Sequence, residues 1–201
     1  MFPLETVLFP HAMLDLHVFE PRYQALVRDL LTGDCEFGIV LIERGRDVGG
    51  GDTRFDVGTL SRLVSCDQLF DGEFALTTLG ISRIRILDWL AEQPYPRALV
   101  TEDDRNELRK DDALHLREVE ARLRDLLALY KESGLHDVAG ALPNLDVDIA
   151  IASFQLCQLS PLGPIDAQKL LTCDSVGQRL VLLCDLLDDQ LVILRSGLAD
   201  S

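Results

Sequence analysis

The 201-residue chain carries 34 acidic against 19 basic side chains, a formal net charge of -15. This balance argues against nucleic-acid binding, because affinity for the phosphate backbone depends on clustered lysine and arginine. Hydrophobic residues make up 47% of the chain, which is enough for one folded domain or for one domain with a smaller subdomain. No apolar run approaches the roughly 18 residues of a membrane span, and residues 1–5 lack the basic start of a signal peptide.

The cysteines indicate a reducing compartment. They are odd in number, include no Cys-x-x-Cys pair and lie mostly within apolar runs: Cys35, Cys66, Cys157, Cys173 and Cys184. Buried, reduced thiols are typical of cytosolic proteins. We therefore expect a soluble protein of the cytoplasm.

Residues 1–101 are predicted to form mainly β-strands around one helix. The expected strands are residues 6–9, 13–18, 37–42, 57–69, 73–79, 82–87 and 97–101. Between Pro21 and Gly33, apolar residues recur at helical spacing and predict one amphipathic helix of about three turns, which should pack on the sheet. Short strands at this spacing indicate a curved, mostly antiparallel sheet or barrel.

Turn signals separate these strands. Asp71-Gly72 is a strong hairpin signal, and Gly80 is interpreted as a break between two strands. Residues 44–56 contain four glycines and several charges, and are expected to form an exposed loop. At residues 20–23, Glu20 and Arg22 beside Pro21 are interpreted as an ion-paired corner from strand to helix, anchored by Tyr23.

The second half of the chain is predicted to be a helical bundle. A charged connector at 102–111 separates the β-rich subdomain, residues 1–101, from a helical subdomain, residues 112–201. The expected helices are residues 116–130, 146–156, 165–171 and 176–195. Because the last is apolar on most of its circumference, it should be the central helix of the bundle.

The motifs of nucleotide and nucleophile chemistry are missing. The glycine cluster at 49–51 is not followed by the Gly-Lys-Ser/Thr of a phosphate-binding loop. The chain has no Gly-x-Ser-x-Gly elbow, and nothing near Cys35 in the sequence would lower the pKa of its thiol. We therefore predict no catalytic residues and no bound cofactor.

Metal-binding spacings are also missing. The four histidines are scattered, at His11, His17, His115 and His136. No pair of them has i, i+4 spacing around a carboxylate, although His11 and His17 flank one short strand and could approach each other. Asp146-Val147-Asp148 lacks the glycine and distal glutamate of a calcium loop, so we interpret it as helix N-terminal charge.

Several stretches together resemble a known family. Residues 3–10 contain Pro-Leu followed by Val-Leu-Phe-Pro, and residues 18–23 read Val-Phe-Glu-Pro-Arg-Tyr. The resemblance is to the substrate-binding N-terminal domain of Lon proteases. It continues, in chain order, through residues 37–41, 57–63, 71–72, 77–83, 165–171 and 176–180.

The resemblance implies an α+β fold, a PUA-like β pseudobarrel with one packed helix followed by a C-terminal α-helical bundle. Lon proteases also carry an ATPase module and a Ser-Lys peptidase, and neither would fit in 201 residues. The implied protein is therefore a stand-alone, non-enzymatic relative of the Lon substrate-binding domain.

Two functions remain open. The first is ATP-independent binding of exposed apolar or degron-like segments of unfolded or degron-bearing client proteins, near the junction of sheet and helices, with a protease as a candidate adaptor partner. The second is a small-ligand-binding protein or enzyme that uses the pseudobarrel as a pocket, because fold does not determine function. The sequence leaves the client-binding residues unknown and the oligomeric state open, and it predicts neither nucleic-acid nor membrane partners.

Overall fold

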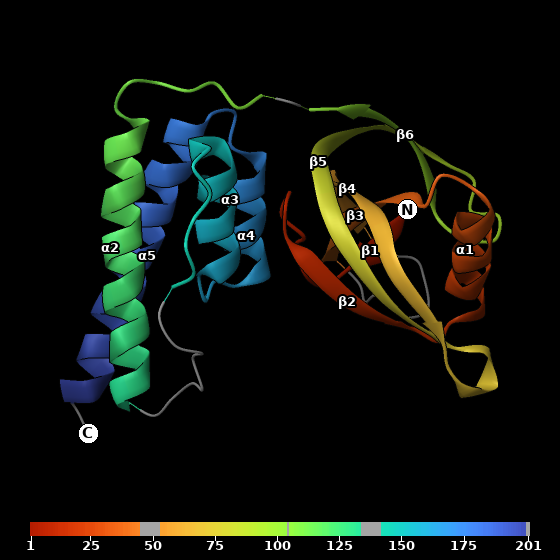
Figure 1. Cartoon of the computed structure of the whole chain (residues 1–201), viewed down its shortest axis with the longest axis horizontal. Helices are drawn as coiled ribbons and strands as arrows, with labels where there is room; N and C mark the ends of the chain where they lie inside the picture. The colour runs from red at the N-terminus through yellow and green to blue at the C-terminus, as the bar shows by residue number, and fades with distance from the viewer. Residues whose placement is uncertain (45–52, 104, 134–141, 200–201) are drawn as a thin grey trace. The chain divides into compact units, whose positions relative to one another are not determined.

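The computed structural model describes residues 1–44, 53–103, 105–133 and 142–199. The chain divides into two compact units, Met1–Asp104 and Arg105–Ser201, which we call the β unit and the helical unit (Figure 1). In the β unit the elements are β1 (Phe2–Leu4), β2 (Met13–Val18), α1 (Pro21–Thr32), β3 (Glu36–Arg44), β4 (Thr53–Gln68), the 3-10 turn η1 (Phe70–Gly72), β5 (Phe74–Leu90) and β6 (Arg97–Glu102).

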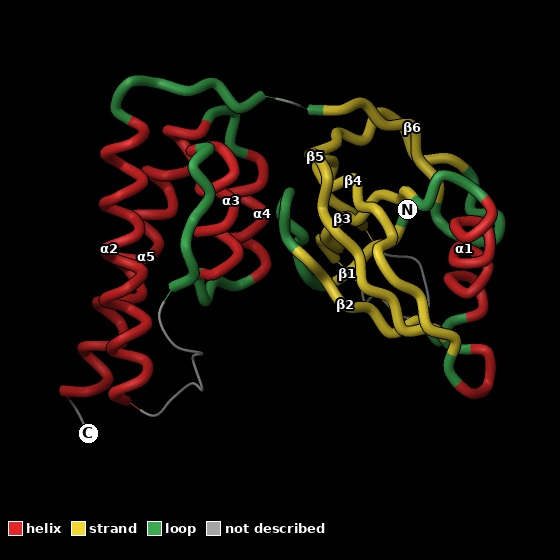
Figure 2. The backbone as a smooth tube through the Cα atoms, in the orientation of Figure 1, coloured by secondary structure: helices red, strands yellow, loops and turns green. Residues whose placement is uncertain are grey.

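These strands form one mixed sheet (Figure 2). Its order is β1-β3-β4-β5-β2, and β6 pairs with β5 beside this path. The β1–β3 pair is parallel and the other pairs are antiparallel. Because β1 and β2 end the path and do not pair with each other, the predicted pseudobarrel is not closed, while the predicted α+β class is confirmed.

Helix α1 begins and ends where the sequence predicts. Pro21 occupies its first turn, where its missing N–H costs no helical hydrogen bond, and Gly33 follows its last residue. The helix buries Tyr23, Leu26, Val27 and Leu30. The Tyr23 ring stacks on Phe2 of β1 with centroids 4.2 Å apart, so this apolar stripe joins the core of the β unit.

Two strand predictions in the β unit are wrong. Residues 6–9 are not a strand: Leu8 and Phe9 are buried, and the Leu8 carbonyl accepts a hydrogen bond from the Thr59 hydroxyl at 2.5 Å. The expected strands 73–79 and 82–87 form one strand, β5, with Gly80 inside it. A Cβ at Gly80 would lie 2.3 Å from the Phe9 carbonyl oxygen, so this glycine permits a close backbone approach and does not end a strand.

Both ends of the loop predicted at 44–56 belong to strands. Arg44 ends β3, and residues 53–56 open β4, where Thr53 and Arg54 pair with β3. The rest of the prediction, including the glycine cluster at 49–51, lies outside the described residues.

The helical unit contains α2 (Asp112–Ser133), α3 (Ile149–Leu159), α4 (Pro164–Thr172) and α5 (Val176–Ala199). Each overlaps a helix predicted from the sequence. Asp148 caps α3, because its Oδ1 accepts the N–H of Ala150 at 2.8 Å, as expected for helix N-terminal charge. Helix α5 contacts α2, α3 and α4, so it is the central helix of the bundle. Among the described residues, none of the helices is long and apolar enough to span a membrane.

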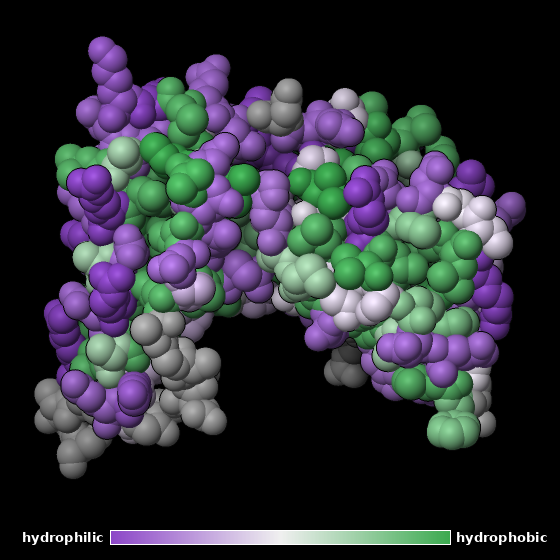
Figure 3. All heavy atoms as spheres, viewed as in Figure 1, coloured by the Kyte–Doolittle hydropathy of each residue, from purple (hydrophilic) through white to green (hydrophobic). Residues whose placement is uncertain are grey.

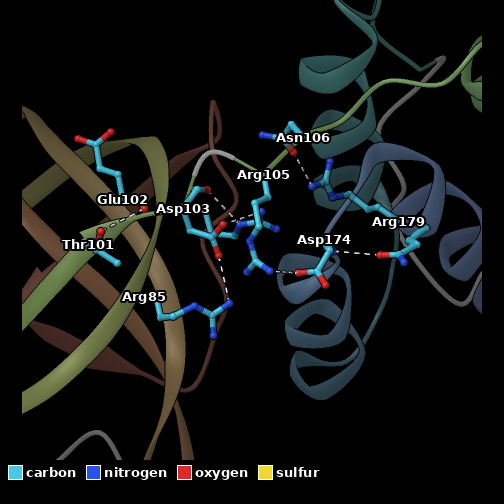
Figure 4. A network of polar contacts seen from close by, with 10 residues as sticks. Arg85, Thr101, Glu102, Asp103, Arg105, Asn106, Asp174 and Arg179 are labelled. Carbon is cyan, nitrogen blue, oxygen red and sulfur yellow. Dashed lines mark hydrogen bonds and ion pairs between the residues drawn. The ribbon is translucent and has the colours of Figure 1, made fainter.

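Residues of the predicted connector at 102–111 make polar contacts with both units (Figure 4). On the β-unit side, Asp103 is buried and pairs with Arg83 at 3.2 Å and Arg85 at 3.3 Å.

On the helical-unit side, Asn106 accepts a hydrogen bond from Arg179 at 2.8 Å, and Arg105 forms an ion pair with Asp174. Arg179 itself is fully buried, with its guanidinium 3.7 Å from the centroid of the Phe154 ring. Each end of the connector is therefore fixed to its own unit by arginine.

Candidate functional site

Three large apolar side chains are exposed at one end of the β-unit sheet. Phe19 lies between β2 and α1 and is 47% exposed, while Leu69 and Phe70 at the β4–β5 turn are 41% and 95% exposed. We call these three residues the apolar end. Figure 3 shows hydrophobic side chains at the projecting end of the β4–β5 hairpin.

A polar contact ties the two segments of the apolar end together. His17, at the end of β2, lies with its Nε2 2.6 Å from Oε2 of Glu73, the residue before β5. The His17 ring is 5.8 Å from the Phe19 ring, centroid to centroid. The backbone N–H of Leu69 donates to the Glu73 carbonyl at 2.8 Å. Residues about 50 positions apart in the chain therefore form one local surface.

A small cleft of about 60 Å³ adjoins Phe19. It lies between β1 and β2, where the sheet remains open. Its walls are Phe2, Leu4, Leu16, His17, Val18, Phe19, Glu20 and Tyr23. Most of these side chains are apolar, so the cleft can hold one small apolar side chain and offers no converging set of acids and bases.

The predicted corner between strand and helix is confirmed beside this cleft. Arg22 Nε lies 3.2 Å from Glu20 Oε2, and the Arg22 guanidinium lies 4.6 Å from the centroid of the Tyr23 ring. These contacts link side chains on either side of the first turn of α1, directly after Phe19.

The described part of the chain contains no group of three or more His, Cys, Asp or Glu side chains placed to hold a metal ion. Of the two histidines that the sequence places near one strand, His17 pairs with Glu73, and the backbone N–H of His11 donates to the Gly80 carbonyl. His136 lies outside the described residues.

Burial suppresses the reactivity of three thiols. It raises the pKa of Cys66 and Cys184, and raises that of Cys157 to about 12. Because the thiolate is the nucleophile, these cysteines are poorly suited to covalent catalysis at neutral pH. Cys35 adopts a positive φ of 59°, and its Sγ lies 3.4 Å from the Leu30 carbonyl oxygen.

The fold and this surface define an α+β protein with an open mixed sheet, a helical bundle and an exposed apolar end. The chain belongs to the family of the ATP-dependent protease La (LON) substrate-binding domain, which matches residues 1–189. The resemblance seen in the sequence is therefore confirmed, and the domain that matches is the non-catalytic, substrate-binding part of that protease.

Known relatives agree with this assignment. The chain is 26% identical over 199 residues to Lon protease 2 of Herpetosiphon aurantiacus, covering 95% of this chain and 23% of that protein. It is 28% identical over 202 residues to Lon protease 2 of Sorangium cellulosum, covering 94% and 24%. The chain thus spans about a quarter of the length of these curated relatives.

Solved structures show the same fold. A Lon N-terminal domain protein from Xanthomonas campestris matches with a TM-score of 0.61 and 26% identity, covering 90% of this chain and 94% of that one. The N-terminal domain of the Mycobacterium avium complex Lon protease has a TM-score of 0.63 at 17% identity, covering 92% and 95%. The second likeness concerns the fold alone.

The sequence did not identify the apolar end, although part of the signal was present. Phe70 directly precedes Asp71-Gly72, and an aromatic residue at the tip of a predicted hairpin has nothing to pack against. Phe19 gave no such signal, because its exposure depends on how β2 and α1 meet.

Proposed function

We propose that this chain binds exposed apolar or degron-like segments of client proteins at the apolar end, without catalysing a reaction and without nucleotide. The observation that carries the proposal is the exposure of Phe19, Leu69 and Phe70 at one end of the sheet, with a small, mostly apolar cleft beside Phe19. Exposed groups of large apolar residues mark interaction sites in folded proteins. Membership of a substrate-binding family supports the same role.

The cleft and the open sheet suit an extended client. A small apolar side chain of the client would enter the cleft between Phe2 and Leu16, while its neighbours pack on Phe19 and Phe70. Strand β2 ends the strand order, so its outer edge can accept main-chain hydrogen bonds from an added strand. Main-chain pairing would supply affinity with little sequence preference, and the cleft would favour an apolar anchor.

The expected affinity is modest. A fully buried phenylalanine removes on the order of 150–250 Å² from water, at roughly 25 cal/mol for each Å² of apolar area. Association and the ordering of a flexible client offset much of this gain. We therefore expect micromolar dissociation constants, as suits a protein that samples many clients.

Charge should select among clients. The net charge of -15 attracts basic segments and repels acidic ones over roughly a Debye length of 10 Å. Unfolded or degron-bearing proteins with basic flanks are thus the proposed partners, and a protease to which they are passed is the proposed adaptor partner.

The small-ligand alternative has less support in the β unit. Pockets for small molecules usually measure about 300–1,000 Å³, whereas the cleft measures about 60 Å³. The geometry favours one side chain of a larger partner over a whole metabolite.

A peptide array probed with the full chain tests the proposal. Bound peptides should be enriched in aromatic, aliphatic and basic residues and depleted in Asp and Glu. Added salt should weaken the basic preference and leave the apolar preference intact, because salt screens charge and strengthens burial. An array without sequence bias, together with a metabolite that reproducibly raises the melting temperature, would replace this proposal with the small-ligand function.

A further inference from the structure

The helical unit holds a larger pocket that client binding at the apolar end does not use. It has a volume of about 390 Å³ and lies where the first turns of α2 and α5 meet. Its walls include Asp111, Asp112 and His115 from the α2 side and Val181, Leu182 and Asp185 from α5. The volume is within the range of small-molecule sites.

One buried polar atom in its wall, Nδ1 of His115, lacks a hydrogen-bond partner among the described residues. Asp112 is only 1% exposed. Its Oδ2 accepts the backbone N–H of Arg109 at 2.8 Å, and its Oδ1 faces Gly177 of α5. His115, one turn further along α2, is the residue whose Nδ1 is left without a partner in the described part of the chain. Buried polar atoms in folded proteins are normally satisfied, so His115 Nδ1 points to a ligand group beside the Asp112 carboxylate.

Gly177 keeps the pocket open at Asp112. A Cβ at this glycine would lie 2.7 Å from Asp112 Oδ1, so any other residue would cover the carboxylate. The glycine therefore leaves the buried carboxylate accessible from the first turn of α5.

The charges in the wall favour a cation. The pocket is lined by three carboxylates, those of Asp111, Asp112 and Asp185, against one guanidinium, that of Arg109. Asp111 and Asp185 have no ion pair among the described residues. The N-termini of α2 and α5 carry partial positive charge, which favours negatively charged groups. Asp111 and Asp112 already place negative charge beside these N-termini. Val181 and Leu182 add an apolar wall.

We propose that this pocket binds a primary ammonium or guanidinium group carried on a short aliphatic stem. The cation would lie among the carboxylates and donate to Asp112 Oδ1, while the stem packs on Val181 and Leu182. The same chemistry occurs in free alkyl amines and guanidines and in lysine or arginine side chains of a bound protein. This site does not depend on the proposed function of the apolar end.

Calorimetric titration of the full chain tests the site directly. The probes are agmatine and n-butylamine, with n-butanol as the neutral control and butyrate as the anionic control. We expect both cations to bind, agmatine more tightly because it carries a guanidinium and an ammonium group and so two positive charges, and both controls to fail. Equal binding of butyrate, or binding of neither cation, would overturn the proposal.

Two matched variants locate the binding. Asp185→Asn removes a carboxylate from the pocket wall, whereas Asp189→Asn removes an exposed carboxylate one turn further along the same helix. Agmatine affinity should fall about fivefold in the first variant and stay unchanged in the second. Circular dichroism should show both folded, because both side chains are exposed. Equal affinities in the two variants would refute the assignment.

Competition separates the two sources of the cation. Peptides with a central lysine, or with norleucine in its place, are titrated against the agmatine-loaded chain. Displacement by the lysine peptide alone assigns the pocket to a protein side chain. Displacement by neither peptide assigns it to a free amine, and displacement by both in equal measure contradicts recognition of the cation.

Discussion

Replacing Gly80 by alanine should destabilise the β unit strongly, because the backbone of residues 8–12 packs directly on this position. An added Cβ would lie 2.3 Å from the Phe9 carbonyl oxygen and 3.2 Å from Thr59 Cγ2. Relief requires the crossing segment to move by nearly 1 Å, since ordinary contacts begin above about 3 Å. Two backbone hydrogen bonds depend on the present position: His11 N–H to the Gly80 carbonyl at 2.8 Å, and Gly80 N–H to the Ala12 carbonyl at 2.9 Å.

The magnitude follows from these contacts. Two weakened hydrogen bonds cost about 1 kcal/mol each, and overpacking a close contact costs about 1–3 kcal/mol. Gly80→Ala should therefore lower the free energy of unfolding by about 3–5 kcal/mol. Gly72→Ala is the matched control: its φ of +80° carries strain, but its Cβ would meet nothing within 4 Å, so about 1 kcal/mol is expected.

Urea unfolding followed by tryptophan fluorescence measures both variants. The single tryptophan, Trp89, lies on β5 and reports on the β unit. If Gly80→Ala is no more destabilising than Gly72→Ala, the close approach of residues 8–12 to β5 is wrong.

Three further outcomes are expected. Leu123→Ala should cost about 2–5 kcal/mol in the helical unit by circular dichroism, because Leu123 is fully buried. Leu114→Ala, at a 59% exposed site on the same helix, should stay within about 0.5 kcal/mol, and equal losses would contradict the packing of α2. The Cys157 thiol, whose pKa burial raises from 9.0 to about 12, should resist alkylation in the native protein and react after unfolding. Alkylation of the native protein at neutral pH would refute the burial of this thiol. Because the thiol ionises at lower pH in the unfolded chain, the free energy of unfolding should also fall as pH rises above about 9, by up to about 1.4 kcal/mol per pH unit. Arg179→Met removes the anchor of Asn106, so trypsin should cut after Arg105 faster, and an unchanged cleavage rate would show that the anchor does not hold the connector.

Local patterns in the sequence predicted much of the fold. Helix α1 follows from its apolar spacing after Pro21, and β2 has the predicted bounds. The helical unit was also predictable, because helical hydrogen bonds and periodicity are local.

Long-range pairing explains the errors. Phe2–Leu4 is a strand only because it pairs in parallel with β3, about 37 residues away. The segment at 6–9 has strand-like residues, yet its carbonyl groups bond to side chains and turns. Gly80 suggested a break because glycine is uncommon within strands. In the structure the backbone of residues 8–12 packs against Gly80 so closely that a side chain there would clash with it.

The candidate sites were less predictable than the fold. Phe70 could be placed at a hairpin tip from Asp71-Gly72 alone. The cleft between β1 and β2 required knowing that the sheet does not close, and the pocket at Asp112 required the first turns of α2 and α5 to meet. Both depend on contacts between segments far apart in the chain, which no local pattern records.

Binding of a labelled unfolded client by apolar-end variants tests the central claim most directly. Phe19→Ser and Phe70→Ser together should weaken binding at least tenfold, because both exposed aromatic rings of the apolar end are lost. Leu87→Ser and Leu99→Ser, which alter side chains 63% and 54% exposed elsewhere in the β unit, should leave the affinity unchanged in fluorescence anisotropy. Equal losses in the two double variants, or full affinity in the first with its fold intact, would contradict client binding at the apolar end.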